Sequence, residues 1–189
     1  MALLDDLPFE GTDLQEVMAR VDPMLGAAVQ SLDEGTPLRD GLQRLRDGET
    51  LAQIMGLTAE DLEVLYALGI RQIEARDLDK AADTFANLGQ IDPLEARHRY
   101  CMALVLQLQG KLQPAAHMYM QFLALDATNP DGYMRLAELH LAAGELDEAK
   151  ALFQETLRFA GDAPDHAETV AQAKAQLARF DNEFKSEGV

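Results

Sequence analysis

The sequence has one cysteine and no tryptophan. A single cysteine excludes an internal disulfide framework, and Cys101 falls inside a predicted helix, where a small buried hydrophobic residue is more common than a nucleophile. No apolar run reaches the roughly 18 residues that a membrane-spanning helix requires, and the first ten residues lack the basic start of a signal peptide. We therefore expect a cytoplasmic protein that does not enter membranes.

Basic residues are scarce, with 16 Lys and Arg against 33 Asp and Glu, which gives a formal net charge of −17. Such a surface repels nucleic acids, so we expect no nucleic-acid partner. The histidines do not converge with the cysteine or with regularly spaced acids, and the sequence has no Gly-rich phosphate loop and no nucleophile–base pair. The sequence thus predicts no metal, no cofactor and no enzymatic activity.

A period of 34 residues is the strongest feature that is present. It relates RDLDKAADTF at 76–85, GKLQPAAHMY at 110–119 and GELDEAKALF at 144–153. Small and aromatic residues recur in fixed columns: Gly69, Ala103 and Ala137; Ala81, Ala115 and Ala149; and Phe85, Tyr119 and Phe153. The period resembles the tetratricopeptide repeat, a hairpin of two antiparallel helices whose close crossing requires Gly or Ala.

We therefore predict an all-α protein, with three tandem tetratricopeptide repeats in an α-solenoid between N-terminal amphipathic helices and a C-terminal capping helix. The predicted divisions are an N-terminal segment 1–58, repeats over 59–163 (about 62–95, 96–129 and 130–163), and a cap and tail over 164–189. The predicted helices are 59–75, 78–90, 95–109, 112–125, 130–143, 146–160 and 164–185.

The N-terminal segment carries its own apolar stripe, interrupted by Pro23, which should kink or divide the helix. The candidate residues for dimerisation on this stripe are Leu14, Val17, Met18, Val21 and Leu25. An exposed stripe of this length needs a surface to cover it. Either the segment folds back on the repeats and covers their groove, or it pairs with a second copy of the chain.

The first helix of each repeat lines the concave face of such an array. One facet should pack within the repeat: Leu65, Leu68 and Gly69; Met102, Ala103 and Leu106; and Leu136 and Ala137. The neighbouring facet should face the groove: Tyr66, Ile70 and Ile73; Tyr100, Leu104, Gln107 and Leu108; and Met134, Glu138 and Leu141. Because this facet is mostly apolar, it suits an extended peptide, unless the N-terminal helices or a neighbouring subunit fill it.

Residues 49–157 resemble the class II chaperones of bacterial type III secretion, which hold hydrophobic translocator proteins before export. The resemblance rests on GETLAQIMGLTAEDLEVLYALG at 48–69 and on MRLAELHLAAGELDEA at 134–149. Three features depart from that family. HRYCMAL at 98–104 stands where small residues are usual, Ile70 and Ile73 stand where aromatic residues are common, and the N-terminal region is longer than usual.

The resemblance implies a chaperone that binds a short extended translocator segment, with Tyr66, Ile70 and Ile73 around one pocket and Tyr100, Leu104 and Leu108 around the next. It also implies a homodimer formed through the N-terminal helices. The alternative function is a general tetratricopeptide-repeat scaffold that joins folded proteins. That alternative shares the fold and differs in the kind of partner.

Overall fold

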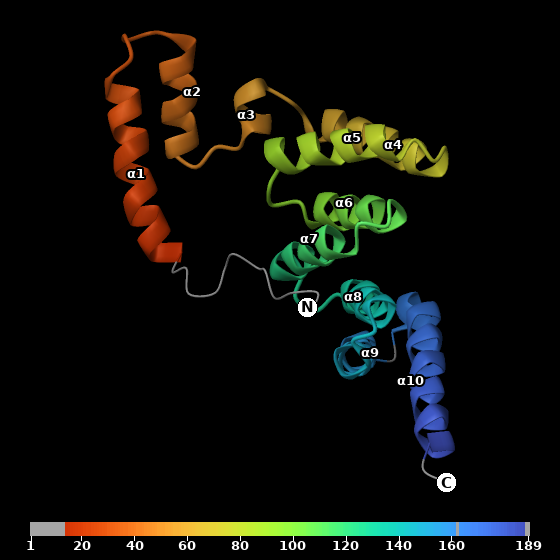
Figure 1. Ribbon diagram of the computed structural model, residues 1–189. Coiled ribbons are helices and arrows are strands. Elements are labelled where there is room, and N and C mark those ends of the chain that lie inside the picture. The colour runs from red at the N-terminus through yellow and green to blue at the C-terminus, as the bar shows by residue number, and fades with distance from the viewer. Residues whose placement is uncertain (1–13, 162, 188–189) are drawn as a thin grey trace.

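The computed structural model describes the backbone of residues 14–161 and 163–187, and the side chains of these residues except 14–20, 25 and 181–187. Every regular element in this part of the chain is helical, and the helices follow one another as a curved array (Figure 1). The elements are α1 (Leu14–Gln30), α2 (Pro37–Arg46), α3 (Leu51–Met55), α4 (Ala59–Glu74), α5 (Leu78–Ile91), α6 (Ala96–Leu108), α7 (Leu112–Leu125), α8 (Pro130–Ala143), α9 (Leu146–Ala160), the 3₁₀ turn η1 (Pro164–His166) and α10 (Ala167–Glu187).

Three helical hairpins, α4–α5, α6–α7 and α8–α9, form the body of the molecule. The bounds of these six helices agree with the predicted ranges to within one residue. The turns of the second and third hairpins use glycines with positive φ, 76° at Gly110 and 81° at Gly144, as expected for left-handed helix ends. The first hairpin makes the same turn with Arg76, at φ 60°.

Close packing inside each hairpin follows the small-residue columns. The side chains of Ala81, Ala115 and Ala149 are fully buried. A Cβ atom added to Gly69 would lie 2.6 Å from Cζ of Phe85, so only glycine fits under that ring. The sequence columns therefore report helix crossings, as the close-packing argument predicts.

The predicted packing of Leu68 within the first repeat is wrong. Its side chain is 46% exposed, whereas Leu136, in the same column of the third repeat, is 5% exposed. The reason is position in the array, because the first repeat has no preceding repeat to cover this side of α4.

The N-terminal helices α1 and α2 form a hairpin of their own, beside the first repeat (Figure 1). Nε of Arg46 on α2 donates to Oδ1 of Asp22 on α1 at 2.9 Å, and Val29 is buried in the hairpin. Helix α1 runs through Pro23 without being divided. The hairpin connects to the repeats through α3, which packs against α5.

Arg44 fixes the joint between α2 and α3. Its guanidinium donates to the carboxylate of Glu49 and to the carbonyl oxygens of Gln53 and Ile54 at the end of α3. The hydrogen bond from Arg44 lowers the pKa of Glu49, which keeps this carboxylate charged. The polar contacts of Arg44 therefore connect the hairpin to α3.

The last helix closes the array. The predicted single helix over 164–185 is a 3₁₀ turn followed by α10, which packs on α9 and on the start of α8. Ala173 and Phe180 of α10 are buried with Phe153 of α9, so α10 covers the apolar end of the third repeat. No helix in the described residues is both long and apolar enough to cross a membrane.

Candidate binding groove

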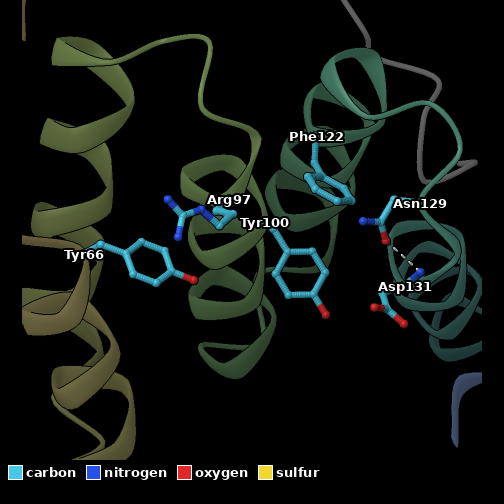
Figure 2. A pocket seen from close by; sticks show the side chains of 6 residues that line it. All are labelled: Tyr66, Arg97, Tyr100, Phe122, Asn129 and Asp131. Carbon is cyan, nitrogen blue, oxygen red and sulfur yellow. Dashed lines mark hydrogen bonds between the residues drawn. The ribbon is translucent and has the colours of Figure 1, made fainter. Parts of the chain in front are cut away.

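The first helices of the three hairpins, α4, α6 and α8, lie in sequence along one side of the array, and a hollow of about 170 Å³ opens between them (Figure 2). It is lined by Tyr66, Arg97, Tyr100, Phe122, Asn129 and Asp131. These residues come from all three repeats. The hollow is therefore a product of stacking and belongs to no single hairpin.

Aromatic rings form its walls. The ring of Tyr66 meets that of Phe85 edge-on at 5.8 Å between centroids. The ring of Tyr100 meets Tyr119 at 5.5 Å and Phe122 at 5.2 Å, both edge-on. Edge-to-face contacts of this kind hold each ring in one orientation. The two groove tyrosines are thus supported from behind by the buried aromatic residues of the second helices.

Arg97 ties the first repeat to the second across the hollow. Its guanidinium bonds Glu63 of α4 at 2.5 Å and Glu95 at 3.1 Å, and lies 4.8 Å above the centre of the Tyr66 ring. The hydrogen bonds from Arg97 lower the pKa values of Glu63 and Glu95. The positive charge of Arg97 is therefore already balanced by two carboxylates.

The hydroxyls of the two groove tyrosines have different partners. Oη of Tyr66 lies 3.4 Å from Sγ of Cys101. The pKa of Tyr66 is raised mainly by burial and, to a smaller extent, by this contact. Oη of Tyr100 accepts a hydrogen bond from Nε of Arg135 at 3.3 Å, and Arg135 in turn bonds Glu138 at 3.0 Å. A partner on the next first helix therefore holds each tyrosine.

The far edge of the hollow is polar and rigid. The side chain of Asn129 caps α8 by accepting from the backbone N–H of Asp131 at 3.0 Å. Oδ1 of Asp131 accepts from the hydroxyl of Thr169 on α10 at 2.6 Å. The edge of the hollow is therefore connected to the capping helix.

Most of the residues predicted to face the groove are half-buried, as a partly open surface requires. They are Tyr66, Ile70, Ile73, Tyr100, Leu104, Gln107, Glu138 and Leu141, while Leu108 is 38% exposed. Tyr66, Ile70 and Ile73 all pack on the core formed by Ala81, Phe85 and Leu88. The amide oxygen of Gln107 accepts from Oη of Tyr119 at 2.9 Å.

Met134 is the exception among the predicted groove residues. It occupies the column of Tyr66 and Tyr100 but is only 4% exposed, packed with Phe153 and Phe180. The cause is α10, which lies against the third repeat and supplies Phe180. The prediction that Met134 faces the groove is therefore wrong.

The residues proposed for dimerisation lie on α1. The side chains of Leu14, Val17, Met18 and Leu25 fall outside the described residues, and Val21 is half-buried. Nearby, Met24 on α1 is 71% exposed and Leu38 on α2 is 61% exposed. Dimerisation through this hairpin remains a prediction.

Metal-binding and nucleophilic groups do not gather in the described part of the chain, where no three His, Cys, Asp or Glu side chains come together as ligands. Cys101 is buried behind Tyr66, and burial raises the pKa of its thiol. A raised pKa leaves the thiol protonated and weakly nucleophilic.

Sequence reasoning missed several residues that line or support the hollow: Arg97, Phe122, Asn129, Asp131 and Arg135. One signal was available. Glu63 and Arg97 carry opposite charges 34 residues apart, and residues separated by one period are neighbours on adjacent first helices. Arg135 gives no comparable signal, because its partner Tyr100 carries no charge.

The family model described as tetratricopeptide repeat matches residues 106–177. The low calcium response locus protein H of Yersinia pseudotuberculosis is 26% identical over 133 residues, which cover 70% of this chain and 79% of the relative. A type III secretion complex from Aeromonas hydrophila contains a chain that is 30% identical, with a TM-score of 0.69 over 76% of this chain and 95% of that one.

PcrH of Pseudomonas aeruginosa is also similar. Its structure with the chaperone binding region of PopD is 31% identical to this chain, with a TM-score of 0.64 over 68% of this chain and 96% of PcrH. Identity above 30% over almost the whole of PcrH, together with the same helical array, establishes common descent. The chain therefore belongs to the PcrH-like class II translocator chaperones of type III secretion.

Proposed function

We propose that this protein binds an extended, apolar segment of a hydrophobic translocator in the groove along α4, α6 and α8, and so keeps the translocator soluble until export. One observation carries the proposal. A row of half-buried apolar side chains runs between stacked repeats, at Tyr66, Ile70, Tyr100 and Leu104, with a hollow of about 170 Å³ beside it. The relative PcrH has been solved with the chaperone binding regions of PopD and PopB, which supports a cargo of the same kind here.

Burial of apolar side chains supplies the binding energy. Each well-buried aliphatic or aromatic side chain contributes roughly 1.5–3 kcal/mol, so three or four of them offset the ordering of an extended peptide. Covering these side chains also masks the part of a translocator that is most prone to aggregate or to insert early. The formal charge of −17 keeps such a complex away from anionic membrane surfaces.

The cellular setting is part of the same proposal. A chaperone that holds cargo before export acts in the cytoplasm, where it meets the newly made translocator. We also propose a homodimer formed through α1, because α1 and α2 leave Met24 and Leu38 exposed. No catalytic step is required for this role.

Isothermal titration of the full chain with overlapping peptides from the translocators encoded in the same genome tests the proposal. We expect one extended apolar peptide to bind saturably, and the Tyr66→Ala/Tyr100→Ala double variant to lose at least tenfold in affinity, since two aromatic contacts disappear. Tyr133→Phe is the matched control, because Tyr133 stacks on Phe159 away from the hollow.

Two results would count against this function. Unaltered binding by the double variant, with helicity retained, would place the peptide elsewhere on the array. Absence of binding by every peptide, from a well-folded protein, would favour the alternative of a scaffold for folded partners.

A further inference from the structure

The chain has four tyrosines, and all four hydroxyls lie in the described part of the structure. Oη of Tyr119 donates to the amide oxygen of Gln107 at 2.9 Å, and Oη of Tyr133 donates to the carbonyl oxygen of Ala127 at 2.9 Å. Oη of Tyr66 lies 3.4 Å from Sγ of Cys101, a contact in which either group can be the donor. The hydroxyl protons of Tyr119 and Tyr133 therefore have oxygen acceptors within the fold, and that of Tyr66 can use the sulfur of Cys101.

Tyr100 differs from the other three. Its oxygen accepts from Nε of Arg135, and an arginine can only donate, so the hydroxyl proton is not used in that bond. Within the described residues this proton has no acceptor. Figure 2 shows the ring of Tyr100 between Tyr66 and Asp131, in the middle of the hollow.

The arrangement makes Tyr100 a strong donor. A hydrogen bond from a guanidinium to the phenol oxygen withdraws electron density, and hydrogen bonds in such a chain strengthen one another. Arg135 is held in turn by Glu138, the next acid along the same face of α8. The order Glu138, Arg135, Tyr100 fixes both the position and the polarity of the hydroxyl.

An extended cargo segment requires hydrogen-bond donors for its main chain. Each residue of such a segment carries a carbonyl oxygen, and burying that oxygen against apolar side chains without a partner costs free energy. The other polar donors of the hollow are directed at acidic side chains: Arg97 donates to Glu63 and Glu95 through Nε, Nη1 and Nη2, and Nδ2 of Asn129 donates to Asp126. The free proton of Tyr100 can therefore satisfy a buried carbonyl.

We propose that the Tyr100 hydroxyl, positioned by Arg135, donates a hydrogen bond to one main-chain carbonyl of the bound translocator segment. This inference rests on the proposed function and makes it more specific. Tyr100 sets the register of the bound segment through a bond to the main chain of the segment, whatever side chains the segment carries. The apolar pockets then select which side chains bind, and the bond to Tyr100 determines which positions of the segment meet the pockets.

A double-mutant cycle between protein and peptide tests the hydrogen bond. The probe is the shortest translocator peptide that the full chain binds in titration, together with a series in which one amide at a time is replaced by an ester, whose carbonyl is a weaker acceptor. We expect Tyr100→Phe to weaken the parent peptide by roughly 2- to 10-fold. One peptide of the ester series should bind the wild-type protein more weakly than the parent peptide does, by a similar factor. The Tyr100→Phe variant should bind this ester peptide and the parent peptide equally well.

Arg135→Met tests the positioning role of Arg135. It keeps the phenol of Tyr100 and removes the guanidinium that donates to the phenol oxygen. We expect the selective penalty at that one ester to shrink in Arg135→Met, a result that a merely structural role would not produce. Tyr133→Phe, which loses a carbonyl bond outside the hollow, should leave the whole ester series unchanged.

Three results would overturn the inference while leaving the proposed function standing. The first is wild-type affinity of Tyr100→Phe for every peptide. The second is independent, additive losses for Tyr100→Phe and each ester. The third is an affinity penalty at one ester that disappears in the Gln107→Leu variant and persists in the Tyr100→Phe variant. If no peptide binds the wild-type chain, the proposed function fails and the inference falls with it.

Discussion

The first repeat and the two repeats that follow it carry matching columns but bury them to different degrees. Val64 is 64% exposed, whereas His98, one period later, is 2% exposed. Leu68 is 46% exposed, whereas Leu136 in the same column is 5% exposed. The later residues are covered by the hairpin before them, and α3 is too short to give the first repeat the same cover. Burial in a stacked array is thus supplied by the neighbouring unit.

The largest expected effect on stability comes from truncating the two leucines that share one column of the repeat, Leu136 and Leu68. Leu136→Ala should lower the free energy of unfolding by about 2–5 kcal/mol, because it leaves a cavity under the second hairpin. Leu68→Ala should change it by about 0.5 kcal/mol or less, because the site is open to solvent. Urea unfolding followed by circular dichroism measures both. Equal losses in the two variants would show that Leu68 is covered in solution.

A second prediction concerns the tight crossing inside a hairpin. Ala115→Leu should destabilise the fold by about 1–3 kcal/mol, because the fully buried alanine leaves no room for three further carbons. Ala124→Leu, on the exposed face of the same helix α7, is the matched control and should be nearly neutral. An unchanged melting curve for Ala115→Leu would refute the repeat alignment.

The smallest effect concerns the ion pair between the first and second repeats. Arg97 lowers the pKa of Glu63 in the folded chain, so this carboxylate stabilises the fold above its unfolded pKa of about 4.3. That stabilisation is lost as the pH falls below this value through the folded pKa. Glu63→Gln should therefore lower the melting temperature slightly at pH 7 and less at pH 3.

Glu60→Gln, on the same helix and without an ion pair among the described residues, is the control for the loss of one negative charge. A Glu63→Gln penalty that is as large at pH 3 as at pH 7 would assign the effect to packing and not to charge.

The fold was predictable because the 34-residue period records local geometry. Small residues at the helix crossing, such as Gly69 under Phe85, are required by the packing of one hairpin and therefore recur in each repeat, while a turn glycine recurs in the second and third hairpins, at Gly110 and Gly144. The arrangement of α1 and α2 was not predictable. Among the described residues it involves the ion pair of Arg46 with Asp22, the burial of Val29 and the contacts of Arg44, none of which repeats.

The candidate groove was predictable where the helical phase decides it. Tyr66 and Tyr100, which phase assigns to the groove, are both half-buried and line the hollow. Phase gave the wrong result at Met134. The exposure of this position depends on whether a following helix covers it, and α10 covers it with Phe180. Phase also missed Arg97 and Arg135, since these residues act across repeats and phase describes one helix at a time.

Helix α10 has a consequence for how such a protein can change in evolution. Each hairpin has the small-residue columns of its own helix crossing, so a 34-residue unit duplicated inside the array would keep its internal packing. A unit added after residue 163 would instead meet a face of the third repeat that Ala173 and Phe180 of α10 already fill. Lengthening at that end would therefore require α10 to move to the end of the added hairpin.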